Sequence, residues 1–387
     1  MKRVYLDHAA TTPVDPEVAE AMARVLREVP GNPSSIYAEG RAARALVDRA
    51  RDEVASALGA TPAEIVFTSG GTEADNLALR GTLKALRASS KDHLVTTAIE
   101  HHAVLDTAHD LEGNAHVRLT IVAVDRDGRV DPAAIGQAIE ERTGLVSVMH
   151  GNNEIGILQP IERIGAICRE RGVTFHSDAV QTVGALPFDV RRIPVDLVSV
   201  NAHKFYGPKG VGALYVRKGT RIATMQTGGG QEKGRRTGTE NVAGIVGLGT
   251  AMRLAAERRD AESARQARLR DRLIAGVRTR VPDAILNGHP TERLPNNASF
   301  CFPGTQGEAL VIALDLEGFS ASSGSACTSG NTEPSHVLLA LGLEPSVAQG
   351  SLRLTVGRET TEADIDALLH ALPPIVERLR SISAVPV

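Results

Sequence analysis

Short apolar runs alternate with amphipathic helical patterns through residues 15–255. The runs are rich in β-branched and aromatic side chains, which is typical of buried strands. We expect strands at Ala63–Thr68, His93–Ala98, Val117–Ala123, Leu145–Met149, Val173–His176, Leu197–Val200 and Ala213–Val216. Helical patterns lie between most of them, as at Thr72–Arg87, Pro132–Arg142 and Ile161–Glu170. This alternation predicts an α/β fold with a mostly parallel central sheet and helices on both faces.

A long charged helical pattern follows at Arg253–Arg280. Leu269, Leu273 and Val277 recur every four residues, which predicts one apolar stripe along that helix. A chain of 387 residues is long enough for roughly two or three domains. We therefore expect a large domain at 15–255, and a smaller α/β domain made of 1–14 and 256–387.

Composition narrows the class of protein. Lys and Arg number 43 against 46 Asp and Glu, so the net charge of −3 gives no polybasic footprint for nucleic acid. Met1–Asp7 has too short an apolar run for a signal peptide, and no stretch nears the ~18 apolar residues of a membrane helix. The chain has three cysteines, which are too few for a disulfide framework or a Cys₄ metal site. We expect a cytoplasmic protein without nucleic-acid or membrane partners.

A glycine turn follows the first strong strand. Ser69–Glu73 reads SGGTE and opens a helix, where free N–H groups and the helix dipole favour an anion such as phosphate. Thr72 could cap this helix or donate its hydroxyl to the phosphate. An ordinary strand–helix turn is the alternative. The pattern matches neither GxGxxG nor GxxxxGK[ST], so it does not favour a dinucleotide or P-loop site.

An acid and a lysine stand at the ends of two later strands. Asp178 ends an apolar run and needs a cationic partner if it is buried, although a helix cap is the alternative. Lys204 lies between a strand and a Gly-Pro turn; it is either a solvated surface lysine or an amine able to form a Schiff base. Phosphate cradle, acid and lysine together are what a phosphorylated aldehyde cofactor requires.

The three cysteines differ in setting. Cys168 lies in a helical pattern and Cys301 in an apolar strand pattern, so both are expected in the core. Cys327 lies in a Ser- and Gly-rich stretch, 322–330, where a thiol is accessible. His101 and His102 follow a strand without any metal-ligand spacing, so we expect no resident metal. One of the two histidines is expected at the site, with capping as the alternative.

Motifs along nearly the whole chain resemble those of the NifS/IscS-like cysteine desulfurases. These are enzymes of the class V aminotransferase family that use pyridoxal 5′-phosphate (PLP) and have the fold type I architecture of PLP-dependent transferases. The resemblance rests on YLDHAATTPVDP (5–16), GNPSS (31–35), IVFTSGGTEADN (65–76), EHHAVLD (100–106), NNEIG (152–156), HKFYGPKGVGALYVR (203–217), GGGQEKGRRTGT (228–239) and SSGSACTSGNTEPS (322–335). Only the combination is specific.

The resemblance implies a PLP site. Lys204 would carry PLP as a Schiff base and shuttle the Cα proton, and Asp178 would pair with the pyridine nitrogen. His101 would stack on the ring and take a proton from the substrate thiol. The other cofactor contacts would come from Gly71, Thr72, Asn153, Gln181, Asn201, His203 and, across a homodimer, Thr239. Asn201 stands where the family commonly has serine.

The resemblance also implies the reaction. Asn153 and Arg353 would bind the carboxylate of L-cysteine, the arginine bidentately. The Cys327 thiolate would attack the substrate sulfur, leaving a persulfide on Cys327 and releasing L-alanine. A mobile loop would then carry the sulfur to an acceptor protein, such as an iron–sulfur scaffold or a thiolation protein. Cys327 is also considered as a transient ligand of an iron–sulfur cluster.

Two other functions remain open at this point. The same fold could serve an aminotransferase or a selenocysteine lyase, and transamination would not need the thiol of Cys327. A sulfur- or iron-carrying scaffold without enzymatic activity would use Cys327 and the nearby histidines, and it would be colourless. Visible absorbance from PLP therefore separates the enzyme from the scaffold.

Overall fold

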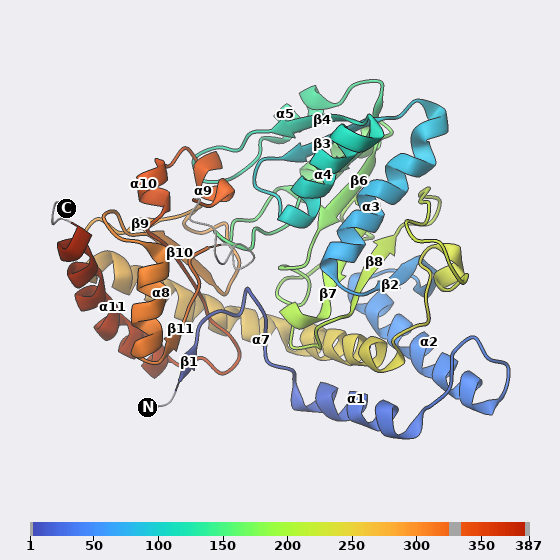
Figure 1. The fold of residues 1–387 in the computed structure, drawn as a ribbon, viewed down its shortest axis with the longest axis horizontal. Coiled ribbons are helices and arrows are strands. Elements are labelled where there is room, and N and C mark those ends of the chain that lie inside the picture. Colours follow the sequence, from blue (N-terminus) through green and yellow to red (C-terminus); the bar gives the residue numbers. More distant parts are fainter. Residues whose placement is uncertain (1–2, 325–333, 384–387) are drawn as a thin grey trace.

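The computed structural model describes residues 3–324 and 334–383. Its centre is a seven-stranded sheet with the order β2-β8-β7-β6-β5-β3-β4 (Figure 1). The strands are β2 (Ile65–Thr68), β3 (His93–Thr97), β4 (Arg118–Val122), β5 (Thr143–Ser147), β6 (Thr174–Asp178), β7 (Leu197–Asn201) and β8 (Gly212–Val216). Neighbours from β7 to β4 are parallel, and β8 runs antiparallel to both its neighbours. The prediction of a mostly parallel sheet is confirmed.

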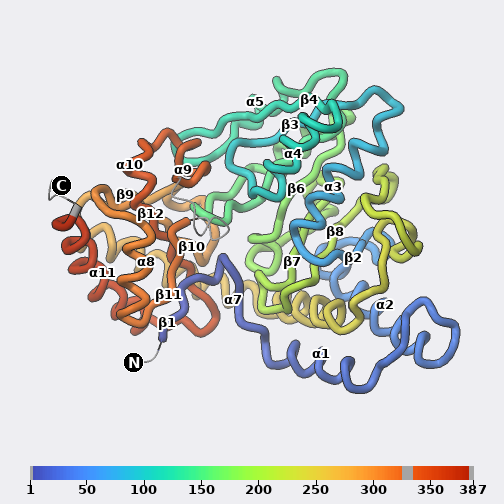
Figure 2. Tube along the Cα trace, viewed as in Figure 1, coloured from blue at the N-terminus to red at the C-terminus, as the bar shows by residue number. Residues whose placement is uncertain are grey.

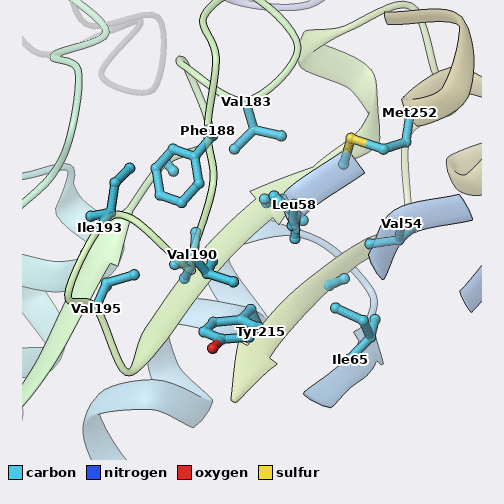
Figure 3. Packing of buried hydrophobic residues seen from close by; sticks show 14 of the residues in the cluster. Val54, Leu58, Ile65, Val183, Phe188, Val190, Ile193, Val195, Tyr215 and Met252 are labelled. Atoms are coloured by element: carbon cyan, nitrogen blue, oxygen red, sulfur yellow. The ribbon is translucent and has the colours of Figure 1, made fainter. Parts of the chain in front are cut away.

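Helices cover both faces of this sheet. On one face lie α3 (Gly71–Leu86) and α4 (His102–Ala115), which share a core with β3 and β8. On the other lie α2 (Ala38–Leu58), α5 (Pro132–Ala138), α6 (Ile161–Glu170) and the first half of α7 (Val242–Arg280), and α1 (Pro16–Glu28) packs on α7. Figure 3 shows part of this second core, where Leu58, Phe188 and Tyr215 lie close together. Burial of the sheet on both faces explains its nearly continuous apolar strands.

Two smaller sheets lie beside the first. β9 (Ile285–Leu286), β10 (Asn297–Cys301) and β12 (Ser351–Thr355) form an antiparallel sheet, and β1 (Val4–Tyr5) pairs in parallel with β11 (Phe319–Ser320). Their helices are α8 (Gly307–Leu316), α9 (His336–Ala340), α10 (Pro345–Ala348) and α11 (Glu362–Ser383). The second half of α7 buries Leu269, Leu273 and Val277 in their core, as its stripe predicts. Figure 2 shows α7 running beneath both groups of elements.

Several element boundaries differ from the sequence prediction. The helix expected to reach Arg142 ends at Ala138, because Ile139 takes an extended backbone and β5 begins at Thr143. Strand β5 also ends at Ser147, two residues before its expected end at Met149. The long helix begins at Val242 rather than Arg253, and the Asn241 side chain accepts from Gly244 N at its start. Gly244, Gly247 and Gly249 in its first turns hid this start, because glycine has a low helix propensity.

The described residues also settle two narrower questions. Cys168 in α6 and Cys301 in β10 are free and buried, as expected. Among the helices of residues 3–324 and 334–383, none has the length and apolar character to cross a membrane.

Candidate active site

A cavity of about 230 Å³ lies where β5, β6 and β7 end at their carboxyl edge. This is the edge of a parallel sheet where ligands commonly bind. Most residues that the sequence predicts for the site line it: Gly71, Thr72, His101, Asn153, Asp178, Gln181, Asn201, His203, Lys204 and Arg353. The fold thus gathers side chains that lie far apart in the chain.

One end of the cavity has the form of an anion cradle. α3 begins at Gly71 without any side-chain cap, so its first N–H groups face this end unpaired by a capping oxygen. A Cβ at Gly71 would come within 3.0 Å of Val180 Cγ2 and 3.4 Å of Asn201 Nδ2. Among the described residues, the buried Asn201 Oδ1 has no hydrogen-bond partner. A phosphate fits here, because it would use the N–H groups of both the helix and the Asn201 amide.

The cavity wall also holds a buried acid. Asp178 ends β6, and its carboxylate accepts from Val180 N at 2.9 Å. Burial raises the pKa of Asp178 to about 6, against the hydrogen bond from Val180 and the charge of Lys204. Asp75 lies close to it, and burial together with the charge of Asp178 raises the pKa of Asp75 well above its usual range. A cationic N–H placed against Asp178 would stabilise its ionised form.

Lys204 stands in a short 3₁₀ turn, Ala202–Lys204, directly after β7. Its Nζ donates to Ala9 O at 2.6 Å and to Ala10 O at 2.8 Å. The turn then reverses through Tyr206, which has a left-handed φ of 67°. Lys204 is therefore held at the cavity by carbonyl groups from the N-terminal segment, and it is not a solvated surface lysine.

His101 both lines the cavity and caps α4, so both interpretations of this residue hold. Its Nδ1 accepts from Ala103 N at 3.0 Å, which assigns the proton of the neutral ring to Nε2. Burial and then the charge of Lys204 lower the pKa of His101 to about 4. The ring can donate from Nε2, whereas accepting a proton requires Nδ1 to release Ala103 N–H. His102 also lines the cavity, with its ring centroid 4.7 Å from that of His336.

Arg353 brings a guanidinium from β12 to the cavity. Its side chain is 2% exposed; Nη1 donates to Asn153 O at 2.9 Å, and Nη2 donates to Asp7 Oδ1 at 2.8 Å. Among the described residues, Nε has no hydrogen-bond partner. The group therefore retains donors for a carboxylate after its structural contacts are made.

One predicted site residue lies away from this cavity, and another cannot be placed relative to it. Thr239 is exposed in the chain that precedes α7 and is not part of the cavity wall. Cys327 lies outside the described residues. Ser335 is one of the first described residues after the segment that contains Cys327. Its Oγ donates to Glu154 Oε2, and Glu154 lines the cavity.

Sequence reasoning missed several neighbours of these residues. Asp7, Ala9 and Ala10 contact the key side chains, and Asp75 and His336 line the cavity. Backbone carbonyl groups leave no signal in a sequence. The only available signal was that Asp7–Ala10 lie inside the YLDHAATT motif and Asp75 inside TEADN, to which no role had been assigned.

The whole chain is similar to several known proteins. The chain matches the Aminotransferase class-V family over residues 4–368. It is 50% identical to a cysteine desulfurase IscS of Dictyoglomus turgidum, over 99% of this chain and 97% of that one. A solved NifS-like protein superposes with a TM-score of 0.91 at 38% identity, covering 97% of this chain and all of that one. Another, SspA in complex with cysteine, superposes at 0.80 with 35% identity, covering 91% and 98%.

Proposed function

The chain belongs to the class V aminotransferase family, and we propose that its cavity performs the cysteine desulfurase reaction with Lys204 and Cys327 as the reactive side chains. It has the fold type I architecture and is a PLP-dependent cysteine desulfurase, which converts L-cysteine to L-alanine and passes on the sulfur. This activity makes the aminotransferase and scaffold alternatives unnecessary. What remains to be argued is the role of each residue.

The residues present fit PLP. The uncapped start of α3, with Thr72, Asn201 and His203 nearby, suits the phosphate. When bound, PLP supplies an electron sink that stabilises negative charge at Cα of the substrate. Asp178 would hold the pyridine nitrogen protonated, and Gln181 would donate to or accept from the ring hydroxyl. His101 would cover the ring face.

Lys204 would hold the cofactor through Nζ until the substrate amine replaces it. Once released, Nζ lies near the Ala9 and Ala10 carbonyls and can remove the Cα proton of the substrate. Arg353 would bind the substrate carboxylate through the donors that its structural contacts leave, with Asn153 beside it. These contacts would fix Cα in front of Lys204.

Cys327 would carry out the sulfur transfer. Its thiolate attacks the substrate sulfur, an S–S bond forms, and the C–S bond breaks with its electron pair going to Cβ. Cβ then gains one proton, equal to the one lost by the Cys327 thiol, so L-alanine and a Cys327 persulfide result. His101 would donate from Nε2 rather than accept the thiol proton, since its Nδ1 accepts from Ala103 N.

The wider setting is also a proposal. The chain would act as a cytoplasmic homodimer in which Thr239 reaches the phosphate of the partner's site, since Thr239 is exposed and absent from its own cavity. The large domain would be 15–255, and the smaller one 1–14 with 256–387. An iron–sulfur scaffold or a thiolation protein would accept the sulfur. A native mass measurement and the spectrum of a Thr239→Ala variant would test the dimer and its shared site.

The observation that carries the proposal is that Lys204 and Asp178 meet in one cavity with the uncapped start of α3. We expect purified protein to show the visible absorbance of enzyme-bound PLP, and Lys204→Ala to lose this band. Lys209→Ala, an exposed lysine of the same turn, should keep it. If both variants keep the band, Lys204 is not the residue that holds PLP.

The role of Cys327 needs its own experiment. Cys327→Ala should stop the release of L-alanine and sulfide from L-cysteine while the visible band stays, and Cys301→Ala should keep the activity. Unchanged product release from Cys327→Ala would contradict the persulfide route. Selenocysteine offered as a competing substrate would then define the substrate preference.

A further inference from the structure

Arg353 is held by a carboxylate that lies outside the cavity. A guanidinium as buried as this one needs charged or polar partners, and Asp7 supplies the carboxylate at 2.8 Å. Arg353 and Asn153 are part of the cavity wall, whereas Asp7 is not. Asp7 therefore contacts the guanidinium from behind and leaves its remaining N–H groups for the cavity.

Asp7 is itself fixed by the same strand that carries Arg353. Asp7 and Thr355 form a parallel bridge, and Thr355 N donates to Leu6 O at 2.7 Å. Ala9 N donates to Thr355 Oγ1 at 2.9 Å. Because Thr355 holds the backbone on both sides of Asp7, the segment that carries the carboxylate is tied to the strand that carries Arg353.

The same segment continues to Lys204. Two and three residues after Asp7, the carbonyl groups of Ala9 and Ala10 both accept hydrogen bonds from Lys204 Nζ. Gln181 Nε2 also donates to Ala9 O, at 3.0 Å. Figure 2 shows this N-terminal chain passing from β1 toward α1, between the two groups of elements. The segment therefore links a group on the small sheet to a group on the large one.

We propose that Asp7 is a positioning residue that orients Arg353 for the substrate carboxylate and, through Ala9 and Ala10, sets its separation from Lys204. This inference rests on the proposed function, since it takes Arg353 as the carboxylate-binding group. Asp7 touches neither substrate nor cofactor. Its contribution is to limit the orientations of a long side chain, so that little conformational freedom is lost when the carboxylate binds.

The proposal predicts a change in carboxylate recognition alone. L-Alanine and ethylamine differ only by the carboxylate, and both can be titrated against the PLP-loaded enzyme by the change in its visible absorbance. Asp7→Asn keeps the shape but removes the charge. Loss of a charge-assisted hydrogen bond of this kind should weaken L-alanine binding roughly 10- to 100-fold and leave ethylamine binding unchanged.

Two further variants separate the possible failures. Arg353→Met should remove the preference for L-alanine over ethylamine, and adding Asp7→Asn to it should change nothing further. Asp366→Asn, which removes an exposed pair with Arg272 in the same region, should bind both ligands like the wild type. The thermal midpoint of each variant reports on folding independently of ligand binding.

Each outcome decides a different point. If Arg353→Met retains the preference, the proposed carboxylate site fails, and the role of Asp7 fails with it. If Arg353→Met loses the preference but Asp7→Asn keeps wild-type affinity, only the positioning role is overturned. Tighter L-alanine binding by Asp7→Asn would also overturn it, because Asp7 would then be a competitor of the substrate. Equal weakening of both ligands would indicate a general structural role.

Discussion

Two groups of residues meet at the cavity: one belongs to the large sheet and the elements next to it, and the other joins segments 346 positions apart in the chain. The first group, called the floor, is Asp178 and Asp75 of the cavity wall with the buried Glu100 and His176; the second, called the roof, is Ala9, Ala10 and Arg353 of the wall with Asp7 outside it. In the floor, burial shifts the pKa values; it lowers the pKa of His176 to about 3 and raises that of Glu100 to about 8. In the roof, the Arg353 guanidinium pairs with the Asp7 carboxylate at 2.8 Å.

Because their environments differ, the floor and the roof are suited to different tasks. Floor groups are neutralised or hydrogen-bonded within the large sheet; His176, for example, contacts Ser147 Oγ at 2.8 Å and Ser199 Oγ at 3.0 Å. They are suited to control the electronics of a cofactor. The roof is suited to select and orient a charged substrate, because its N-terminal segment contacts both Arg353 on the small sheet and Lys204 beside the large one. Changes in the floor should alter chemistry, and changes in the roof should alter binding.

The largest expected effect lies in the floor, at Asp178. Asp178→Asn cannot hold a pyridine nitrogen protonated, so turnover of L-cysteine should fall about 10²- to 10³-fold, with a shifted visible band. Asp366→Asn, which removes an exposed carboxylate paired with Arg272 that is not part of the cavity wall, is the control and should keep wild-type turnover. Turnover by Asp178→Asn within tenfold of the wild type would show that the acid does not control the cofactor.

The sequence alone predicted the floor better than the roof. Asp178 and Lys204 follow apolar strands, and the carboxyl ends of parallel strands must meet at one edge, so their convergence could be expected from the pattern. The contact between Asp7 and Arg353 joins opposite ends of the chain, and no local pattern encodes it. The carbonyl groups that hold Lys204 belong to alanines, whose side chains carry no chemical signal. The start of α7 was missed for a similar reason, because its first turns are rich in glycine.

The next largest effect is expected where the N-terminal segment of the roof packs against Gly357. A Cβ on Gly357 would lie 2.0 to 2.3 Å from ring atoms of His8, which follows Asp7 directly. Gly357→Ala should therefore displace the segment, cost about 1–3 kcal/mol of stability and weaken L-alanine binding. Urea unfolding and the same absorbance titration measure the two effects.

The matched control for Gly357 is Gly113 in α4, where a Cβ would meet nothing within 4 Å. Gly113→Ala should raise stability by about 0.5–1 kcal/mol, because alanine is the better helix former. If Gly357→Ala behaves like Gly113→Ala, the packing of His8 does not hold the roof in place.

A smaller effect is the pH dependence of stability that Glu100, in the floor, should produce. Burial raises the pKa of Glu100 to about 8, above its usual value of 4.5, so the folded protein binds this proton more tightly than the unfolded chain. Its contribution to stability is complete below about pH 4.5 and is lost as pH rises through 8, at no more than ~1.4 kcal/mol per pH unit. Glu100→Gln should remove this slope. Urea unfolding at pH 5.5, 6.5 and 7.5 compares the two proteins, and parallel slopes would contradict the assignment.

The smallest effect compares one hydroxyl of the roof with one elsewhere in the core. Thr355 Oγ1 accepts from Ala9 N, so Thr355→Val leaves a buried N–H without its acceptor and should cost about 1 kcal/mol of stability. It should also weaken L-alanine binding severalfold, less than Asp7→Asn, since the pair of Asp7 and Arg353 remains. Thr82 in α3 is equally buried, but among the described residues its Oγ1 has no partner, so Thr82→Val should be neutral or slightly stabilising. Equal stability losses for the two variants would mean that the hydroxyl of Thr355 does not anchor the N-terminal segment, and that the roof depends on the ion pair alone.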